Sequence, residues 1–395
     1  MARIGIDIRC LAEGRRTGVE EYTLNLLTHL FEIDQKNEYV LFFNSFRSSN
    51  TDFFWIKKYS NVTLKRFGFP NKLLNFLFWY LNWPKIDKMI GGADIFFMPN
   101  IIFGSVSRET KLVLTIHDLS FERYPQTFSW KRRIWHVFIN TKKICQRADK
   151  IIAVSNSTKN DLEFLYKISP EKIQVVYSGI SDKFKVVDRN DEKLISVKEK
   201  YNLPYKFILY LGTIEPRKNI TGIVKAFGQL QKFSKKNNPP AGGGEIFKYK
   251  LVIAGSKGWM NEKIFFEIEK SGHKDKIIFL DFVADEDKEY VFNLTSLFVY
   301  PSFFEGFGFP PLEAMQCGVP VIVSNNSSLP EIVGRAGILI DPDKPEEIYL
   351  AMKEILVSRE LKEKLIEQGL AQSKLFDWKK TAEEFLSALN KIKTF

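Results

Sequence analysis

The sequence predicts an α/β protein in which two doubly wound, Rossmann-like domains follow one another. Its 395 residues are too many for one ordinary core and suit two domains of roughly 150–200 residues each. Short apolar runs alternate with helix-like amphipathic segments, which is the rhythm of βαβ units. A polar, charged stretch at Asp188–Lys200 interrupts this rhythm, which then restarts.

The first half of the chain carries the elements of one domain. Six apolar runs are expected to form buried parallel strands: Ile4–Ile8, Tyr39–Phe43, Ile95–Met98, Leu112–Ile116, Ile151–Val154 and Ile173–Tyr177. Gly18–Phe31 and Trp130–Arg147 have the apolar spacing of amphipathic helices. We therefore place an N-terminal Rossmann-like domain at residues 1–185, followed by a linker region at 186–203.

The second half repeats the pattern. Its expected strands are Phe207–Leu211, Leu251–Ala254, Ile277–Leu280, Leu297–Tyr300, Pro320–Val323 and Ile338–Ile340. They predict a C-terminal Rossmann-like domain at 204–375, with Asn237–Gly244 as an exposed loop. A final helix is expected at 376–395, where Phe385, Leu386 and Leu389 share one face and favour packing back toward the N-terminal domain. Ligands of such sheets bind at the carboxyl ends of the strands.

Composition and charge narrow the class of protein. With 45% hydrophobic and 27% charged residues, the chain is expected to be globular. Its net charge of +11 favours polyanions: phosphates, nucleic acid or an anionic membrane surface. Basic residues gather in the first half, as in Lys131–Arg133 and Lys142-Lys143, although a solvated face would look the same. We expect no nucleic acid partner, because no helix-turn-helix, zinc finger or base-stacking motif is present.

The cysteines and the N-terminus bear on the compartment. Cys10, Cys145 and Cys317 lie far apart without CxxC spacing, so neither a disulfide framework nor a zinc site is expected. The start reads as a strand and not as a signal peptide. The longest uncharged run, Leu73–Pro84, is shorter than the ~20 residues of a membrane span. These features predict a cytoplasmic protein.

The most informative stretch is Leu297–Ser324. A strand is expected to end near Tyr300, and the turn Glu305-Gly306-Phe307-Gly308 leads into a helix that Pro310-Pro311 open. Gly318 is expected to end that helix. Glycines before a helix start expose N–H groups beside the positive end of the helix dipole, which favours a phosphate site.

Two carboxylates flank this turn. Glu313, placed in the first helical turn, could accept hydrogen bonds from the two hydroxyls of a ribose. Glu305, at the strand end, lies where a sugar beyond the phosphates would sit. Each residue alone also fits a plain interpretation, dipole complementation for Glu313 and an exposed turn for Glu305.

A second strand end brings positive charge. In Leu209–Ile220 the strand is expected to end at Gly212, and Lys218 begins a helix-like segment. Arg217 and Lys218 would then lie at the mouth of the sheet, where they could neutralise a diphosphate. As an isolated pair they would be ordinary surface charge.

Together these residues resemble the retaining glycosyltransferase family 4, whose fold is GT-B. Glu305 and Glu313 match its paired glutamates in the context EGFGFPPLEAMxCGxPVIxS, and GTIEPRKN looks like the donor motif of a branch rich in bacterial mannosyltransferases. The resemblance implies that Lys218 binds the donor diphosphate, that Glu313 binds the ribose and that Glu305 contacts the transferred sugar. It further implies a donor cradle formed by Gly306, Phe307, Gly308 and Phe309. Many members carry arginine where this chain has Thr213, and we infer that Arg217 supplies that charge.

The N-terminal domain offers two further candidates, Gly18 and His117. Gly18 opens the first long helix, so its backbone could approach phosphate or acceptor, or could simply start the helix. His117 follows the strand ending at Ile116. A lone histidine is commonly a packed residue, but the resemblance implies a catalytic histidine here that contacts the donor sugar.

No metal site is expected. Two acidic patterns, Asp285-Glu286-Asp287 and Asp341-Pro342-Asp343, precede helix-like segments, where aspartate caps free N–H groups. The family resemblance likewise implies metal-independent catalysis, with no cofactor besides the nucleotide-sugar substrate.

The aromatic stretch Phe67–Trp83 has two interpretations. It could be a core helix, or an apolar acceptor surface near a membrane. The N-terminal domain is the acceptor side in the family, so the basic residues nearby favour a lipid-linked acceptor and peripheral attachment to the inner face of an anionic membrane.

The family resemblance therefore implies a retaining hexosyltransferase that moves mannose from GDP-mannose onto a glycan or lipid-linked glycan acceptor in cell-surface polysaccharide synthesis. UDP- and dTDP-sugars are alternative donors. A GT-B epimerase or hydrolase of nucleotide sugars remains open, as does a non-catalytic nucleotide- or nucleic-acid-binding protein.

Overall fold

The chain folds into two compact units. A computed structural model describes residues 1–12, 17–46, 53–236 and 248–393. The first unit comprises residues 1–119, 130–179 and 377–395, and the second comprises 120–129 and 180–376. The loop predicted at Asn237–Gly244 lies outside the described residues.

The first unit is built on a seven-stranded sheet with the order β3-β2-β1-β4-β5-β6-β7 and parallel pairing throughout. The strands are β1 (Arg3–Asp7), β2 (Glu38–Asn44), β3 (Val62–Phe67), β4 (Ile95–Met98), β5 (Lys111–Ile116), β6 (Lys150–Ala153) and β7 (Ile173–Val175). The strand order reverses at β1, which pairs with β2 on one side and β4 on the other. A ligand site is therefore expected beyond the ends of β1 and β4.

Among the described strands, β3 is the one that the sequence analysis missed. All of its residues are exposed or half-buried, because it pairs only with β2 at the edge of the sheet. An edge strand buries less of its side chains than a central one, so it lacks the continuous apolar run on which the other strands were predicted.

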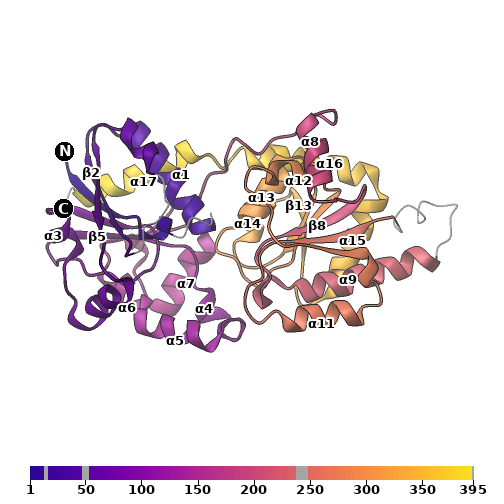
Figure 1. Cartoon of the computed structure of the whole chain (residues 1–395), viewed down its shortest axis with the longest axis horizontal. Helices are drawn as coiled ribbons and strands as arrows, with labels where there is room; N and C mark the ends of the chain where they lie inside the picture. Colours follow the sequence, from indigo (N-terminus) through magenta and orange to yellow (C-terminus); the bar gives the residue numbers. More distant parts are fainter. Residues whose placement is uncertain (13–16, 47–52, 237–247, 394–395) are drawn as a thin grey trace. The chain divides into compact units, whose positions relative to one another are not determined.

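Helices cover both faces of this sheet, with α1 and α17 on one side and α6 and α7 on the other (Figure 1). They are α1 (Gly18–Ile33), α2 (Asn71–Phe76), α3 (Ile86–Met89), α5 (Trp130–Ile139), α6 (Thr141–Arg147), α7 (Asn156–Tyr166) and α17 (Trp378–Lys393). A short π-helical turn, η3 (Leu77–Leu81), continues α2.

The last helix belongs to the first unit. α17 packs on α1, and the ring of Phe385 lies 4.6 Å from that of Phe97 on β4. Where the chain leaves this unit, a Cβ on Gly179 would lie 2.2 Å from the backbone nitrogen of Trp378. Only glycine allows the two chain segments to approach so closely.

The second unit contains a six-stranded sheet with the order β10-β9-β8-β11-β12-β13, again entirely parallel. The strands are β8 (Phe207–Leu211), β9 (Lys250–Ala254), β10 (Ile277–Leu280), β11 (Leu297–Tyr300), β12 (Val321–Ser324) and β13 (Gly337–Ile340). This is the 3-2-1-4-5-6 order of dinucleotide-binding folds, with the reversal between β8 and β11. The predicted class of tandem Rossmann-like domains is confirmed.

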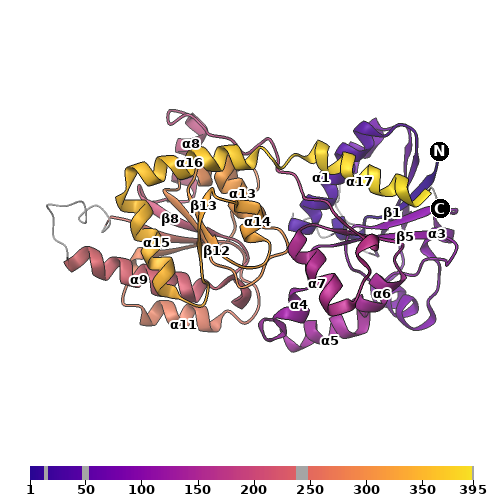
Figure 2. The same ribbon diagram turned by 180° about the vertical axis from the view of Figure 1, so that it is seen from behind.

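The helices of this unit also lie on both faces of its sheet. The views in Figures 1 and 2 agree that α8, α13 and α16 cover one face and α9, α11 and α15 the other. The described helices of this unit are α4 (Ser120–Arg123), α8 (Glu192–Lys200), α9 (Ile220–Lys236), α11 (Glu262–Lys270), α12 (Lys288–Leu294), α13 (Phe309–Gln316), α14 (Leu329–Val333), α15 (Pro345–Val357) and α16 (Arg359–Ser373).

Two segments group differently from the boundaries drawn on the sequence. Residues 186–203, drawn as a linker, lie within the second unit, because α8 packs on α12. Residues 120–129, drawn within the N-terminal domain, also belong to the second unit, where Trp259 Nε1 donates to the Thr127 carbonyl at 2.7 Å. In the same segment the ring of Tyr124 stacks on Phe303 at 6.4 Å.

Candidate functional site

The candidate site begins where the strand order of the second sheet reverses. The loop after β8 forms a short 3-10 turn, η6 (Pro216–Lys218), and α9 starts only at Ile220, so Lys218 lies just before the long helix. The loop after β11 contains Glu305. The Phe303 N–H donates to the Arg217 carbonyl at 2.8 Å, which ties the two loops together.

Lys218 and Glu305 form a buried ion pair. Lys218 Nζ lies 2.6 Å from Glu305 Oε1 and donates to the Tyr300 hydroxyl at 2.7 Å. Both charged residues are 7% exposed. Burying such a pair costs both side chains their hydration. Here the Tyr300 hydroxyl offsets part of that cost, because it accepts a hydrogen bond from Lys218.

Arg217 lies on the other oxygen of the same carboxylate. Its NH1 is 3.3 Å from Glu305 Oε2 and donates to the Phe304 carbonyl at 2.5 Å. Its NH2 lies 2.9 Å from Glu215 Oε1. The guanidinium therefore holds Glu305 in place, and direct contact with a diphosphate would require it to exchange these partners.

The pKa values of the pair follow from burial and charge. Burial alone would raise the pKa of Glu305, but Lys218 and Arg217 outweigh it and lower the pKa to about 2. Burial lowers the pKa of Lys218, and Arg217 adds to that effect, whereas Glu305 opposes it. Glu305 is thus a carboxylate at neutral pH.

The glycine turn is anchored by two serines. Ser327 Oγ accepts from the Glu305 N–H at 3.0 Å. Ser328 Oγ lies 3.0 Å from the Glu305 carbonyl and 2.7 Å from the Phe307 carbonyl, to which it can donate. These hydroxyls come from the loop after β12, so three neighbouring strand ends build the site.

The start of α13 has the predicted glycine turn before the helix, but it offers fewer N–H donors than a usual helix start. Gly308 is the N-cap, with φ +112°, and Pro310 and Pro311 occupy the first turn. Proline has no N–H, so two of the four donors that usually face an anion at a helix start are missing. The backbone donors at this turn are therefore those of Phe307, Gly308 and Phe309, alongside Gly306. Gly318 follows the helix as predicted, with φ +70°.

Glu313 is buried, but not in the first turn of the helix. It is the fifth residue of α13, which places it in the second turn, and it is 3% exposed. The placement in the first turn was wrong because the helix begins at Phe309. The helix dipole acts mainly within the first turn, so dipole complementation explains this buried carboxylate poorly.

Thr213 follows β8, at the position where many members of the family carry arginine. Its uncharged side chain cannot take over the role of that cation. Its carbonyl accepts from the Tyr210 hydroxyl at 3.0 Å, and Tyr210 stacks on Tyr300 with ring centroids 5.9 Å apart. Tyr300 in turn accepts from Lys218. The two tyrosines and Glu215 were missed on the sequence, where a tyrosine at a strand end gives no pattern of its own.

The remaining candidates lie in the first unit. His117 Nε2 is 2.9 Å from the Pro99 carbonyl, and since a carbonyl only accepts, Nε2 carries the proton and Nδ1 is the acceptor of the neutral ring. Burial lowers the pKa of His117, which keeps the ring neutral near pH 7. Its ring contacts Tyr22 edge-on at 4.8 Å.

Gly18 is the first residue of α1, as predicted. The helix start is closed by a capping box, in which Glu20 Oε2 accepts from the Thr17 N–H at 2.7 Å. A carboxylate thus already lies at this positive helix end, which disfavours a phosphate there.

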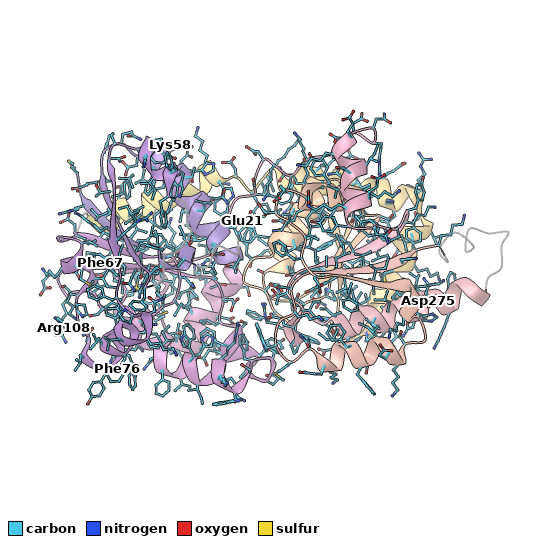
Figure 3. All side chains as sticks on the ribbon, in the orientation of Figure 1. Glu21, Lys58, Phe67, Phe76, Arg108 and Asp275 are labelled. Carbon is cyan, nitrogen blue, oxygen red and sulfur yellow. The ribbon has the colours of Figure 1, made fainter. Side chains whose placement is uncertain are left out.

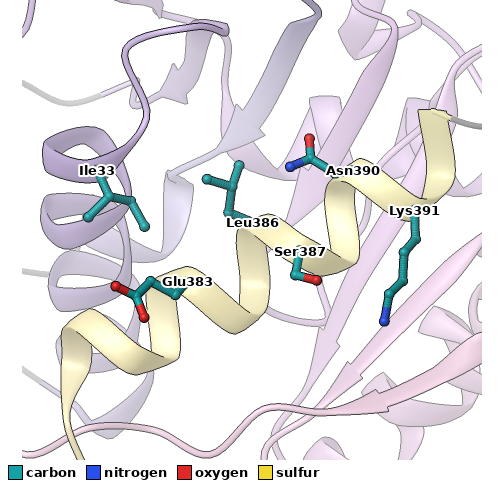
Figure 4. A pocket seen from close by; sticks show the side chains of 6 residues that line it. All are labelled: Ile33, Glu383, Leu386, Ser387, Asn390 and Lys391. Atoms are coloured by element: carbon teal, nitrogen blue, oxygen red, sulfur yellow. The ribbon is translucent and has the colours of Figure 1, made fainter.

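A cavity of about 300 Å³ lies at the reversal point of the first sheet. Asp7, Arg9, Glu20, Asn100 and Trp135 are among its lining residues. Arg9 NH2 donates to Asp7 Oδ2 at 2.6 Å within it. A second hollow, of about 620 Å³, lies between Ile33 and α17 and contains none of the candidate residues (Figure 4).

The acidic patterns are bound by lysines. Asp285 pairs with Lys183 at 2.7 Å, and Asp287 pairs with Lys200 at 2.6 Å. The capping prediction was wrong for both patterns: Asp287 is the N-cap of α12 but makes no capping bond, and the N-cap of α15 is Lys344. Asp341 accepts from the Asp343 N–H within the turn before α15. Among the described residues, no three His, Cys, Asp or Glu side chains cluster as a metal site would need.

Comparisons with known proteins place the chain in a family. Residues 16–184 match the family described as glycosyltransferase family 4, and residues 191–372 match glycosyl transferases group 1. The O-antigen chain mannosyltransferase B of Escherichia coli is 32% identical over 71% of this chain and 70% of the relative. The chain belongs to glycosyltransferase family 4.

A second relative is also a mannosyltransferase, and solved structures share the fold. The serotype-specific mannosyltransferase WbdA of Escherichia coli is 31% identical over 71% of this chain, which spans only 34% of WbdA. Sucrose-phosphate synthase from Thermosynechococcus elongatus has a TM-score of 0.75 at 18% identity over the whole of both chains. Anabaena HepE in complex with UDP-glucose has a TM-score of 0.69 at 16% identity, over 99% of this chain and 100% of HepE. The fold is therefore GT-B.

Proposed function

We propose that this glycosyltransferase is a retaining hexosyltransferase that moves mannose from GDP-mannose onto a glycan or lipid-linked glycan acceptor in cell-surface polysaccharide synthesis. The observation that carries the proposal is the buried cluster of Lys218, Arg217 and Glu305 at the reversal point of the second sheet. The mannosyltransferase relatives favour mannose, and the UDP-glucose complex of HepE favours a sugar nucleotide as the class of donor.

In the proposed reaction, the bond between the anomeric carbon and the diphosphate oxygen breaks, the acceptor hydroxyl oxygen bonds to the same carbon, and its proton passes to the departing diphosphate. Negative charge grows on the leaving diphosphate. The Lys218 ammonium and the N–H groups of Gly308 and Phe309 would stabilise it, since donors fixed in advance in a dry site act strongly. The positive charge of Arg217 would act on the diphosphate at longer range, because its guanidinium is bound to Glu305.

Glu305 would hold the donor sugar and oppose the positive charge that develops on its ring. A covalent role is disfavoured, because both of its oxygens are engaged by cations and its lowered pKa makes it a weak nucleophile. Glu313 would accept hydrogen bonds from the ribose hydroxyls. The neutral His117 ring would meet the sugar through polar contacts.

We propose that no resident metal is needed. Lys218 can neutralise the leaving group, and the carboxylates that could be mistaken for metal ligands are paired with lysines.

The acceptor would enter at the cavity beyond β1 and β4. Cys10, Cys145 and Cys317 are all described and are free thiols, as expected for a reaction in the cytoplasm.

Ligand binding and transfer test the proposal together. GDP and GDP-mannose should raise Tm more than UDP, dTDP or their sugars, because binding to the native state stabilises it. Glu313→Ala should weaken donor binding by at least roughly tenfold, the scale of a lost charged hydrogen bond. The exposed Glu346→Ala on α15 is the matched control.

Three outcomes would contradict the proposal. Release of mannose without any acceptor would favour a hydrolase, and an altered donor sugar an epimerase. Donor binding with no turnover on a broad panel of acceptors would favour a non-catalytic binding protein. A larger thermal shift with another base would reassign the donor.

A further inference from the structure

We propose that the first unit carries a surface that docks onto an anionic lipid bilayer. This surface, called here the aromatic face, consists of side chains from α2 and η3 together with side chains from α5. Its members are Leu73, Phe76, Trp79, Tyr80, Trp130, Ile134, Val137 and Phe138.

The aromatic face is an unusual concentration of exposed apolar side chains. Its eight members are between 44% and 76% exposed. Of the 26 large hydrophobic residues exposed in the described chain, 12 fall within 69–83 and 130–138. Scattered exposed hydrophobics are normal, whereas a contiguous patch usually marks a binding surface.

Helix α5 shows that the exposure is systematic. Trp130, Ile134, Val137 and Phe138 follow the spacing i, i+4, i+7, i+8, so they share one face of the helix. An amphipathic helix normally turns such a face to the core. Here only Ile139 of the ten residues is buried, and the apolar face points outward.

The stretch that the sequence analysis left open between core helix and membrane surface is mostly exposed, so it is not a core helix. Leu74 and Phe78, four residues apart, are buried and fix α2 and η3 to the first unit. Phe76 and Tyr80 stack on one another at 5.7 Å on the exposed side. Figure 3 shows Phe76 projecting at the margin of the unit.

The two segments form one continuous surface although they are far apart in sequence. The ring of Trp79 on η3 packs edge-on against Phe138 on α5, with centroids 5.1 Å apart. Phe76 in turn lies 6.2 Å from Trp79. The aromatic face is therefore a product of the fold and not of a single hydrophobic run.

Charge identifies the partner. Residues 69–86 and 124–148 contain no Asp or Glu. The same two ranges contain eight basic residues: Lys72, Lys85, Lys131, Arg132, Arg133, Lys142, Lys143 and Arg147. An apolar patch with Trp and Tyr, interleaved with Lys and Arg, matches a bilayer whose headgroups are anionic.

Other partners fit less well. A second copy of this chain would bring the same basic residues against each other, which opposes association. Nucleic acid would satisfy the charges, but the aliphatic Leu73, Ile134 and Val137 cannot stack on bases. None of the helices in the described residues has the length and apolarity to cross a bilayer, so the contact would be with its surface.

Vesicle sedimentation of the full chain tests the proposal. We expect binding to phosphatidylcholine vesicles with 30 mol% phosphatidylglycerol at low salt, and at least tenfold weaker binding to pure phosphatidylcholine. The triple variant Phe76→Ser/Trp130→Ser/Val137→Ser should bind at least tenfold more weakly, as should Lys131→Gln/Arg132→Gln/Arg133→Gln.

Matched controls come from α11 and the loop after β10 in the second unit. Phe266→Ser/Phe282→Ser removes equally exposed rings, and Lys263→Gln/Lys270→Gln removes exposed charges. Both should bind vesicles like the parent chain. All substituted side chains are exposed, so the variants should keep the parent Tm.

Three results would overturn the proposal. The parent chain could fail to bind anionic vesicles at low salt, or the control variants of the second unit could lose as much binding as the aromatic variants. The aromatic variants could also change only the oligomeric state in sedimentation velocity, which would assign the face to a second copy. The proposal is independent of the donor: Lys218→Ala should bind vesicles normally whether or not the chain transfers mannose.

Discussion

At the scale of single residues, the site balances two cations against two carboxylates in a buried space. Lys218 and Arg217 share Glu305, and Arg217 also binds Glu215. Burial makes each charge depend on its partners, because an unpaired buried charge is costly. The fixed Glu305 and the cations around it are therefore set in place before any donor arrives.

Lys218→Ala is expected to lower the transfer rate by roughly two orders of magnitude, the scale of losing one donor that stabilises developing charge. It should also lower the free energy of unfolding by about 1–3 kcal/mol, because the buried Glu305 loses one of its two cations while Arg217 remains. Initial-rate kinetics and denaturant unfolding measure the two effects.

A neutral pair separates function from folding. Lys218→Met/Glu305→Gln should regain most of the stability, since neither side chain is then an unpaired charge, but not the rate. Lys225→Ala, an exposed lysine on α9, should change neither. Near-normal turnover of Lys218→Ala would remove this lysine from the mechanism.

Acid titration tests the Glu305 carboxylate. Its pKa is lowered from 4.5 in a free side chain to about 2 in the fold, so its contribution to stability is complete above pH 4.5 and is lost as the pH falls toward 2. The free energy of unfolding of the parent chain should therefore fall more between pH 5 and pH 3 than that of Glu305→Gln. Glu346→Gln should follow the parent chain, and parallel curves for the parent and Glu305→Gln would contradict the lowered pKa.

Sequence reasoning could foresee this cluster only in part. Lys218 and Glu305 were expected at neighbouring strand ends, and the sheet order brings them together. Tyr300 and Glu215 were not foreseen, because their roles depend on contacts that only the folded loops create.

At the scale of elements, the start of α13 is the most constrained feature of the site. Gly308 has a left-handed φ, and a Cβ there would lie 2.8 Å from Leu329 Cδ2 on α14. The turn therefore needs glycine for both its conformation and the space beside it.

Gly308→Ala is accordingly expected to lower the free energy of unfolding by about 1–3 kcal/mol, the cost of a strained backbone conformation. Donor affinity should fall as well, because the N–H groups of Phe307 and Phe309 would shift. Denaturant unfolding and isothermal titration with GDP measure both. Gly68→Ala, with open space around it, is the control, and unchanged GDP affinity in Gly308→Ala would place the phosphates elsewhere.

The elements were predictable where burial is complete. The central strands of both sheets are nearly continuous apolar runs, so they could be predicted from the sequence. The edge strand β3 is half polar and was not predicted. The grouping of 120–129 with the second unit depends on Tyr124 and Trp259 meeting distant partners, which no local pattern encodes.

At the scale of the whole molecule, the C-terminal helix supports a sheet that the chain begins more than 300 residues earlier. Phe385 is fully buried against Phe97. Phe385→Ala should lower the stability of the first unit by about 3–5 kcal/mol, as expected for a large cavity in a packed core.

The same substitution should leave GDP binding by the second unit unchanged, which titration calorimetry can check. The exposed Phe282→Ala should affect neither property. Equal losses of GDP affinity and stability would mean that the two units do not fold independently.

The close approach of Gly179 to Trp378 marks where the chain leaves the first unit and where it later returns. A single crossover near residue 180 between this enzyme and a relative would therefore combine the first sheet of one parent with the α17 helix of the other. A chimaera that exchanges the whole second unit needs a second crossover near residue 377. It must also take residues 120–129 from the parent that supplies the second unit.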